Sequence, residues 1–362
     1  MRIAFRADAS TVAGTGHVVR CLALAGAARR AGWHAEFVCR EYPGHIAQVI
    51  RAEGFGVHLL SAPRDIAAPA GDSYAAWLGV SQEQDAQETA AALQNSGIDW
   101  LVADHYALDA QWEGALLSLV PRLLVVDDLA NRAHVCRVLL DQSFDSTGTP
   151  RYAGLLPPEC VQLLGPRHAL LRPDFGALRP ESLARRAAPV LDRLLVFMGG
   201  SDPHNETARA LQGLSQAKRP LRHIDAVVGQ GYPFLDDLRK QAQACRVPVQ
   251  LHVQTSRMAQ LMAQADFAVT SGGGVSWEKC TLGLPSMVTI VGDNQSLIAH
   301  ELASAGAQVT IGRADAITAE DYARKLDSLD SGQLASMSAR ARDICDGQGT
   351  QRVLDHLLKD AG

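Results

Sequence analysis

The chain has 362 residues, of which 47% are hydrophobic and 20% are charged, and its formal net charge is −5. This length favours two domains, and the negative balance argues against a protein that binds nucleic acid. The seven cysteines contain no CxxC pair, so we expect reduced thiols rather than a disulfide framework or a zinc site. No stretch reaches the roughly 18 apolar residues of a membrane span, and residues 1–30 lack the apolar segment of a signal peptide. We therefore expect a cytoplasmic protein without stable membrane association.

The first half of the chain alternates short apolar runs with helical patterns, which is typical of an open α/β sheet. We expect strands at 3–5, 35–39, 57–60, 100–103, 122–126 and 138–140, and helices at 18–30, from about 44, at 82–94 and at 109–119. Residues 62–81 contain Pro63, Pro69 and Gly71 and predict a long loop. A loop of this length in a compact domain is more often functional than incidental.

Four of these expected strands end in polar residues, namely Asp8, Asp104-His105-Tyr106, Asp127-Asp128 and Asp141-Gln142. In open α/β sheets, ligands bind at the carboxyl ends of the strands, so these side chains predict the floor of a crevice. Polar residues at such positions can also be helix caps. For Asp127-Asp128 the sequence favours neither interpretation.

His17 follows a glycine turn with Gly14 and Gly16 and lies at the start of an expected helix. The positive end of the helix dipole there favours the neutral imidazole, which is available as a base. A neighbouring Asp8 could fix the tautomer of this ring. Alternatively, His17 makes only a local hydrogen bond, and His105 at another strand end is the competing base. Tyr106 could hydrogen-bond a substrate or a water, or it could simply form the wall of the crevice.

The second half repeats the same rhythm after an irregular stretch. Seven prolines fall within residues 143–190 and indicate a linker between domains. We expect strands at 194–197, 223–228, 249–253, 267–270, 286–290 and 309–312, and a short helix capped by Ser256. The tail at 319–359 is predicted to be helical and long enough to reach back over the first domain.

Three glycine-rich turns follow expected strands in this half: Gly199-Gly200-Ser201, Gly229-Gln230-Gly231 and Gly272-Gly273-Gly274. One such turn is an ordinary strand-to-helix connection, but three in one sheet suggest a nucleotide diphosphate held by backbone N–H groups. Glu278, one turn into the helix that follows the last of them, could accept hydrogen bonds from a ribose diol. The chain contains no GxxxxGK[ST], HExxH or GxSxG motif and no metal-ligand spacing, so we expect no metal and no cofactor.

Taken together, several blocks of the sequence resemble one enzyme family. The blocks are Arg6-Ala7-Asp8-Ala9-Ser10, Gly14-Thr15-Gly16-His17 with Arg20, Asp104-His105-Tyr106, Gly199-Gly200-Ser201-Asp202-Pro203, Thr270 to Glu278, and Gly292-Asp293-Asn294-Gln295. In this order, over residues 1–350, they are similar to the UDP-2,4-diacetamido-2,4,6-trideoxy-β-L-altropyranose hydrolases of pseudaminic acid biosynthesis. That family makes a nonulosonic acid used on flagellin and surface polysaccharides. Its fold is similar to that of GT-B glycosyltransferases.

The resemblance implies a GT-B fold, with two Rossmann-like α/β domains that face each other across a cleft. We expect an N-terminal domain at 1–165 that carries the catalytic base, a linker at 166–190 and a UDP-binding domain at 191–345. The C-terminal helix would pack back on the first domain. The implied reaction is attack of water on the anomeric carbon, cleavage of the C–O bond with inversion, and release of UDP.

The resemblance also implies roles for particular residues. His17 matches the general base, and Tyr106 and Asn294 match residues that line the sugar site, while Asp8 is the expected partner of the base. Glu278 matches the ribose contact. The turns at Gly200 and Gly273 match the pyrophosphate cradle. Further predicted substrate contacts lie in the same blocks: Gly14, Gly16, Arg20, His105, Gly199, Ser201, Asn205, Ser271, Gly272, Gly274 and Gln295.

Other functions remain open on the sequence. A GT-B glycosyltransferase that uses a UDP-amino sugar would need the same base and the same cradle. The helices after Gly32 and Gly44 lack the basic and apolar run of a membrane-docked transferase, which favours water as the acceptor. A non-catalytic nucleotide-sugar-binding protein and, less well supported, a UDP-sugar 2-epimerase are further alternatives. In each case the expected partner is a small-molecule nucleotide sugar, and we expect a monomer.

Overall fold

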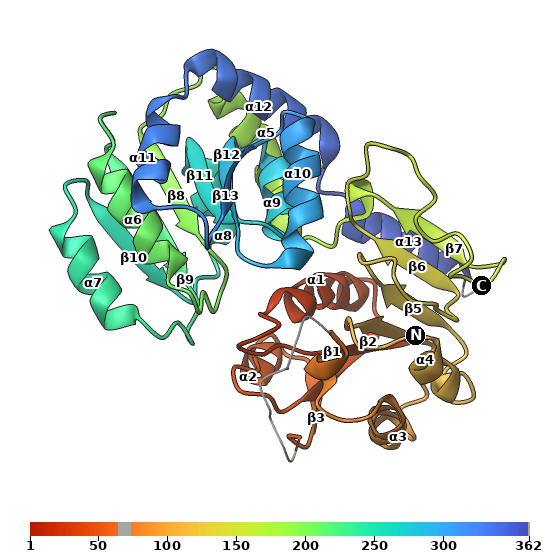
Figure 1. The fold of residues 1–362 in the computed structure, drawn as a ribbon. Helices are drawn as coiled ribbons and strands as arrows, with labels where there is room; N and C mark the ends of the chain where they lie inside the picture. Colours follow the sequence, from red (N-terminus) through yellow and green to blue (C-terminus); the bar gives the residue numbers. More distant parts are fainter. Residues whose placement is uncertain (64–73, 361–362) are drawn as a thin grey trace. The chain divides into compact units, whose positions relative to one another are not determined.

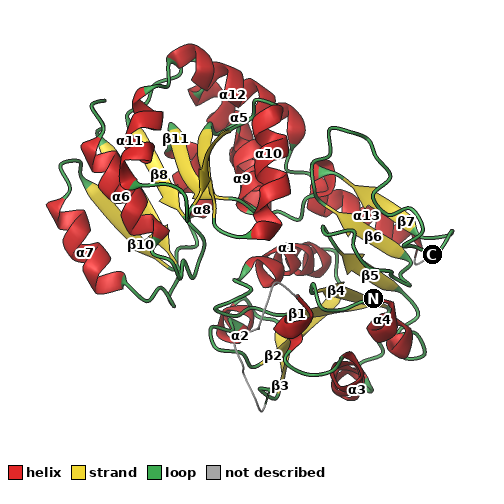
Figure 2. Ribbon diagram, in the orientation of Figure 1, coloured by secondary structure: helices red, strands yellow, loops and turns green. Residues whose placement is uncertain are grey.

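The computed structural model describes residues 1–63 and 74–360, which form two compact units. The first unit contains Met1–Arg172 together with the residues from Gln348 onward, and the second contains Pro173–Gly347. In each unit a layer of strands is covered by helices on both faces (Figure 2). Half of the loop predicted at 62–81, residues 64–73, lies outside the described residues. None of the described helices combines the length and the apolar character that crossing a bilayer requires.

The sheet of the first unit has seven parallel strands in the order β3-β2-β1-β4-β5-β6-β7 (Figure 1). Its strands are β1 (Arg2–Ala7), β2 (His34–Arg40), β3 (Gly56–Leu60), β4 (Trp100–Asp104), β5 (Leu123–Val126), β6 (Val138–Asp141) and β7 (Val161–Leu164). Its α-helices are α1 (Gly16–Arg30), α2 (Ala47–Ala52), α3 (Gln82–Leu93), α4 (Ala110–Leu116) and α13 (Gly349–Asp360). Two short 3₁₀ helices, η1 (Tyr74–Leu78) and η2 (Pro166–His168), complete it.

Alternation along the strands explains why both faces of this sheet are covered. In β1, Ile3 and Phe5 pack with α1 and α13 in one core, whereas Ala4 packs in a second core with Leu93 of α3 and Trp112 of α4. Successive side chains of a strand point to opposite faces, so a strand that is apolar throughout must be buried on both. The C-terminal helix α13 packs against α1 and η2 and thereby belongs to the first unit.

The sheet of the second unit has six parallel strands in the order β10-β9-β8-β11-β12-β13. Its strands are β8 (Arg193–Phe197), β9 (His223–Val228), β10 (Val249–Val253), β11 (Phe267–Ser271), β12 (Ser286–Ile290) and β13 (Val309–Arg313). Its helices are α5 (Pro173–Arg185), α6 (Glu206–Gln216), α7 (Leu235–Ala244), α8 (Met258–Gln264), α9 (Val275–Leu282), η3 (Asp293–Gln295), α10 (Ser296–Ser304), α11 (Ala319–Asp327) and α12 (Ser331–Ile344). Contacts between α6 and α11 and among α5, α8 and α9 define two helical layers.

The structure differs from the sequence-based expectation in four places. The stretch predicted as a linker contains α5, which packs on α8 and α9 in the second unit, because Pro173 stands at a first helical position where proline is tolerated. The short edge strand β7 was not predicted, since it lies in the proline-rich stretch and is largely exposed. Ser256 does not cap α8, whose first flanking residue is Arg257. The helical tail is broken into α11, α12 and α13.

Each strand order contains one point at which the direction of winding reverses. In the first sheet the chain winds outward from β1 to β3 and then returns to add β4 on the other side of β1, and in the second sheet β8 and β11 are the equivalent pair. Ligands of open α/β sheets bind at the carboxyl ends of the strands at such a switch point. The residues that follow β1 and β4, and those that follow β8 and β11, are therefore the expected places for a ligand site.

A network of buried charges lies inside the first unit. Asp85 of α3 accepts two hydrogen bonds from Arg6 of β1, at 3.0 and 2.7 Å, and one from Arg40 of β2, at 2.6 Å. The indole N–H of Trp112 donates to the same carboxylate. Burial alone would raise the pKa of Asp85, but the two guanidinium groups hold it well below its usual range. This network joins α3 to two central strands.

Candidate active site

The first switch point brings His17 and Asp104 together. The two residues belong to α1 and to the end of β4, and the register of the sheet pairs Asp104 with Ala7 of β1. The loop before α1 is closed by two backbone hydrogen bonds between Ser10 and Gly14, and Gly16 is the first residue of the helix. His17 is thus placed in the first turn of α1, above the ends of two neighbouring strands.

Asp104 holds both His17 and Arg20. His17 Nδ1 lies 2.6 Å from Asp104 Oδ1, and Arg20 donates to both carboxylate oxygens, each at 2.6 Å. Burial would raise the pKa of Asp104, yet Arg20 and His17 hold it well below its usual range, so the carboxylate is ionised. An ionised acceptor fixes the proton of a neutral His17 on Nδ1. Nε2 then carries the lone pair that a general base requires.

The predicted partner of His17 was Asp8, and this prediction is wrong. Asp8 Oδ1 accepts a hydrogen bond from the backbone N–H of Arg40 and forms an ion pair with Arg6, both at 2.7 Å. Asp8 is 2% exposed and belongs to the buried charge network. Its closeness to His17 in sequence is misleading, because the neighbouring strand β4 supplies the carboxylate that reaches the imidazole.

His105, the competing base, points into the protein. Its Nδ1 accepts the backbone N–H of Ala107 at 3.0 Å, and its Nε2 lies 3.7 Å from Asp8 Oδ2. Burial lowers the pKa of His105 to about 4, and Arg6 contributes in the same direction. The ring is therefore neutral at physiological pH and directs both nitrogens at protein groups, which argues against the predicted substrate contact.

A cluster of three aromatic rings meets the imidazole of His17 through one of its members, Tyr106. Tyr106 meets it edge to face, with ring centroids 4.7 Å apart and an interplanar angle of 82°. Tyr74 and Trp77 of η1 lie 4.9 and 5.8 Å from Tyr106, and 4.9 Å from each other. The sequence did not single out Tyr74 or Trp77 as site residues. One signal in the sequence could have identified them. They are two aromatic residues three positions apart, within the loop at 62–81 whose length already suggested a function.

Asp127 and Asp128 take different roles. Asp127 accepts hydrogen bonds from Arg132 and from the backbone N–H of Ala130, and is fully buried. Asp128 Oδ2 lies 3.2 Å from a terminal nitrogen of Arg20. Asp128 therefore contacts the cluster of Arg20, Asp104 and His17. Asp127 has a structural role.

At the second switch point, the turn after β11 offers backbone donors. In the part of the chain that the structure describes, no acceptor is found for the N–H groups of Gly273, Gly274 and Val275. Gly273 has φ +93°, a conformation that side chains rarely adopt, which lets the turn expose consecutive N–H groups. These groups lie at the amino end of α9, where the helix dipole favours an anion. Ser271 is the buried last residue of β11.

Three predicted substrate contacts near this turn have different surroundings. Gln295 Oε1 accepts the N–H of Gly272 at 3.0 Å and that of Val291 at 3.3 Å, so it braces two turns against each other. That brace occupies the Gly272 donor. Asn294 is exposed in η3, and Glu278 is half-buried in the first turn of α9.

The turn after β8 is only partly available to an anion. The carboxylate of Asp202 accepts the N–H groups of Glu206 and Thr207, at 2.9 and 2.8 Å, and so already caps α6. The side chain of Asn205, a predicted contact, accepts a hydrogen bond from the Tyr232 hydroxyl. Gly199, Gly200 and Ser201 remain the part of this turn that lies beside the β11 turn, because β8 and β11 are neighbouring strands.

The turn at 229–231 has a packing role. A Cβ atom at Gly229 would lie 2.3 Å from the carbonyl oxygen of Gly200, and the N–H of Gly229 donates to that oxygen at 2.9 Å. Only glycine allows this approach. The turn at 229–231 thus supports the turn at 199–201 rather than contributing to the predicted cradle itself.

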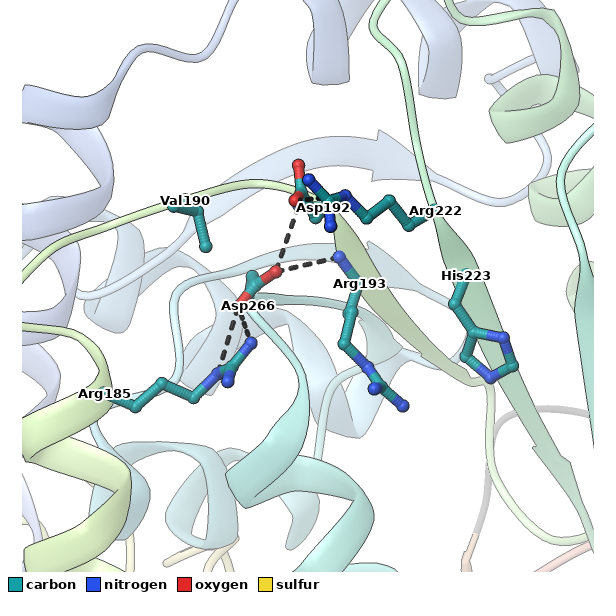
Figure 3. Close-up of a pocket in the computed structure, with 7 residues that line it drawn as sticks. All are labelled: Arg185, Val190, Asp192, Arg193, Arg222, His223 and Asp266. Atoms are coloured by element: carbon teal, nitrogen blue, oxygen red, sulfur yellow. Dashed lines mark hydrogen bonds and ion pairs between the residues drawn. The ribbon is translucent and has the colours of Figure 1, made fainter.

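A cavity of about 390 Å³ in the second unit lies at the amino ends of the strands of its sheet (Figure 3). Arg193 and His223, which line it, are the first residues of β8 and β9, and Asp266 directly precedes β11. The strands are parallel, so the glycine turns follow their opposite ends. Asp266 is engaged by Arg185 and by the N–H groups of Asp192 and Arg193. This cavity is therefore not the candidate site.

Lys279 is a buried ammonium in α9, and we expect its replacement by methionine to stabilise the protein. Its Nζ donates to Thr270 Oγ1 at 2.9 Å, and burial lowers its pKa to about 8. The pKa of an unfolded lysine is about 10.4, so at pH 7 the native state carries a charge penalty of about 3 kcal/mol. Lys279→Met should raise the free energy of unfolding at pH 7 by on the order of 1–3 kcal/mol, measured by urea denaturation.

The pH dependence provides the control for this prediction. Between pH 8 and about 10.4 the unfolded state binds more protons at this lysine than the native state, so wild-type stability should rise with pH. The gain from Lys279→Met should therefore shrink over this interval. A gain that stays constant across the interval would show that packing, and not the buried charge, separates the two proteins.

Comparison with known proteins gives distant relatives, and no protein-family model matches the chain. A UDP-N-acetylglucosamine–N-acetylmuramyl-(pentapeptide) pyrophosphoryl-undecaprenol N-acetylglucosamine transferase of Thiobacillus denitrificans is 30% identical over 67% of this chain and 68% of the relative. The UDP-2,4-diacetamido-2,4,6-trideoxy-β-L-altropyranose hydrolase of Campylobacter jejuni is 23% identical over 85% of this chain and 98% of the relative. The chain spans about half the length of two further curated relatives, with matches over 55% and 56% of them.

Solved structures share the fold over its whole length. MurG of Acinetobacter baumannii has a TM-score of 0.69 and 17% sequence identity, with 99% of each chain covered. The calicheamicin glycosyltransferase CalG4 has a TM-score of 0.64 and 18% identity, with 100% of this chain and 98% of that chain covered. At such identities the likeness shows the fold alone. It confirms the expected pair of Rossmann-like α/β domains.

Proposed function

Because the chain belongs to the GT-B glycosyltransferase-like superfamily, we propose that it is an enzyme that hydrolyses the sugar–phosphate bond of a UDP-sugar. The substrate that we propose is UDP-2,4-diacetamido-2,4,6-trideoxy-β-L-altropyranose, in pseudaminic acid biosynthesis. The similarity to the Campylobacter jejuni hydrolase, over 98% of that protein, supports this choice. The observation that carries the proposal is the Asp104–His17 pair at the switch point of the first sheet.

In the proposed reaction, His17 Nε2 removes a proton from a water molecule whose oxygen attacks the anomeric carbon. The bond between that carbon and the phosphate oxygen breaks, UDP leaves with the electron pair, and the configuration inverts. A positioned general base contributes typically about 10²–10⁴-fold to the rate. The ionised Asp104 holds the Nδ1 proton and stabilises the imidazolium that forms, and Arg20 fixes the orientation of Asp104.

We assign the leaving UDP to the second unit. The N–H groups of Gly273, Gly274 and Val275 would donate hydrogen bonds to the pyrophosphate oxygens and so stabilise the negative charge that develops on them. Glu278 in the same helix would bind the ribose hydroxyls, and Asn294 would line the sugar site. Charge stabilisation by these backbone donors is the reason for proposing that hydrolysis does not require a metal ion.

A sugar transferase is the second candidate. The Thiobacillus denitrificans relative with 30% identity is an N-acetylglucosamine transferase, and the same base and cradle would serve an acceptor hydroxyl. The two functions differ in one measurable property, since a hydrolase needs no acceptor other than water.

We expect the purified protein to release UDP and free sugar from the proposed substrate without an added acceptor and in the presence of EDTA. In ¹⁸O-labelled water the label should enter the sugar, because the proposed reaction cleaves the bond between carbon and oxygen. Mass spectrometry of both products measures this. Label in UDP would overturn the mechanism, and UDP release that occurs only with an added acceptor would establish the transferase instead.

A further inference from the structure

The hydrolytic mechanism does not explain the cluster of aromatic rings that contacts His17 through Tyr106. Tyr106 is buried, whereas Tyr74 and Trp77 are each half-buried. The four other tryptophans of the chain are at most 5% exposed, so Trp77 alone combines a large ring with access to solvent. The cluster of Tyr74, Trp77 and Tyr106, which we call the aromatic wall, meets the imidazole through Tyr106.

The segment that carries two of these rings is anchored to the sheet of the first unit. Leu78, the last residue of η1, is 1% exposed and belongs to the core that includes Val38 of β2 and Trp112. The hydroxyl of Tyr42, just after β2, donates to the carbonyl oxygen of Leu78. The position of Tyr74 and Trp77 beside Tyr106 is therefore fixed by buried contacts of the same short helix.

We propose that Tyr74 and Trp77 are specificity-determining residues, which pack against acylamino and deoxy substituents of the sugar and select against hydroxyl-rich sugars. This inference rests on the proposed function, because it places the reacting sugar at His17. Large aromatic faces pack well on methyl and ring C–H groups. They offer little compensation to a hydroxyl group that has lost its hydrogen bonds to water. A sugar with two N-acetyl groups and a 6-deoxy group presents the first kind of surface, and N-acetylglucosamine, which keeps its 4- and 6-hydroxyl groups, presents more of the second.

The size of the effect follows from this chemistry. A pocket that gains or loses one methyl-sized apolar contact changes kcat/KM by about 10–200-fold. Trp77→Ala removes the largest accessible ring of the wall. We therefore expect the ratio of kcat/KM for the proposed diacetamido-trideoxy substrate to kcat/KM for UDP-N-acetylglucosamine to fall by about 10-fold or more. Trp77→Phe, which keeps an aromatic face, should lose less, and Tyr74→Leu should fall between these variants.

A matched control comes from the second unit. Phe234 is also half-buried and also packs on another ring, that of Tyr232 at 5.8 Å. Phe234→Leu should leave the kcat/KM ratio unchanged. Circular dichroism and thermal unfolding of each variant show whether it is folded. An unchanged ratio in a folded Trp77→Ala protein that still hydrolyses its substrate would overturn the inference and leave the proposed function intact.

Fluorescence gives a readout that does not depend on turnover. Because the other four tryptophans are buried, quenching by acrylamide should report mainly on Trp77, and Trp77→Phe should remove most of the quenchable signal. The diacetamido-trideoxy UDP-sugar should protect this signal, whereas UDP alone should not. If the wild-type protein shows this protection but no hydrolysis, the proposed function fails and the sugar subsite stands. If the sugar gives no protection, the subsite is wrong whether or not hydrolysis occurs.

Discussion

Replacing His17 with alanine is expected to lower kcat for UDP-sugar hydrolysis by about 10²–10⁴-fold, the usual contribution of a general base. The dissociation constant for UDP should change by less than about twofold, because His17 belongs to the first unit and the proposed UDP contacts belong to the second. The physical reason for the rate loss is that Asp104 keeps the Nδ1 proton in place and leaves Nε2 as the acceptor. Steady-state kinetics and isothermal titration calorimetry with UDP measure the two quantities separately.

A histidine at the amino end of a strand in the same sheet provides the control. His34 is exposed and is the first residue of β2, whereas the candidate site lies at the carboxyl ends of the strands. His34→Ala should leave both kcat and UDP binding unchanged. Wild-type turnover in a folded His17→Ala protein would exclude His17 as the base. Loss of both turnover and UDP binding would show that the substitution damages more than the proposed proton transfer.

The fold could be predicted from the sequence because each βα unit carries a local signal. Short runs of three to six mainly apolar residues, followed by polar or glycine-rich turns, identify every strand of both sheets except β7. Strand order carries no such local signal, since it depends on which buried faces pack together. The switch points, and the adjacency of β1 to β4 on which His17 and Asp104 depend, therefore required the structure.

In the candidate site, too, some features have a local signal in the sequence and others depend on contacts between distant residues. His17 and the glycine turn at 272–274 are visible in the sequence, because a glycine-rich entry to a helix is a local pattern. The choice between Asp8 and Asp104 as the partner of His17 is not local. Both residues end strands, and only the register between β1 and β4 decides which carboxylate reaches the imidazole. The brace made by Gln295 also depends on a contact between two turns distant in sequence.

Asp85→Ala is expected to lower the free energy of unfolding by on the order of 3–5 kcal/mol, since it breaks a buried ion-pair network. Arg6 and Arg40 are at most 1% exposed and would each lose hydrogen bonds to this carboxylate, and Trp112 would lose the acceptor of its indole N–H. Asp85→Asn keeps the shape and one acceptor and should cost less. Urea denaturation at pH 7, followed by circular dichroism, measures both variants.

An exposed pair shows what the same substitution costs without burial. Asp236 and Arg239 are paired at 2.9 Å on α7 with both side chains in solvent, so Asp236→Ala should cost less than about 1 kcal/mol. The pKa of Asp85 is held below its usual range, so its contribution should be complete above pH about 4 and decline as the pH falls. The difference between wild type and Asp85→Ala should therefore shrink in acid. If Asp85→Ala costs no more than Asp236→Ala at pH 7, the two arginines find other acceptors, and the network does not hold α3 against the sheet.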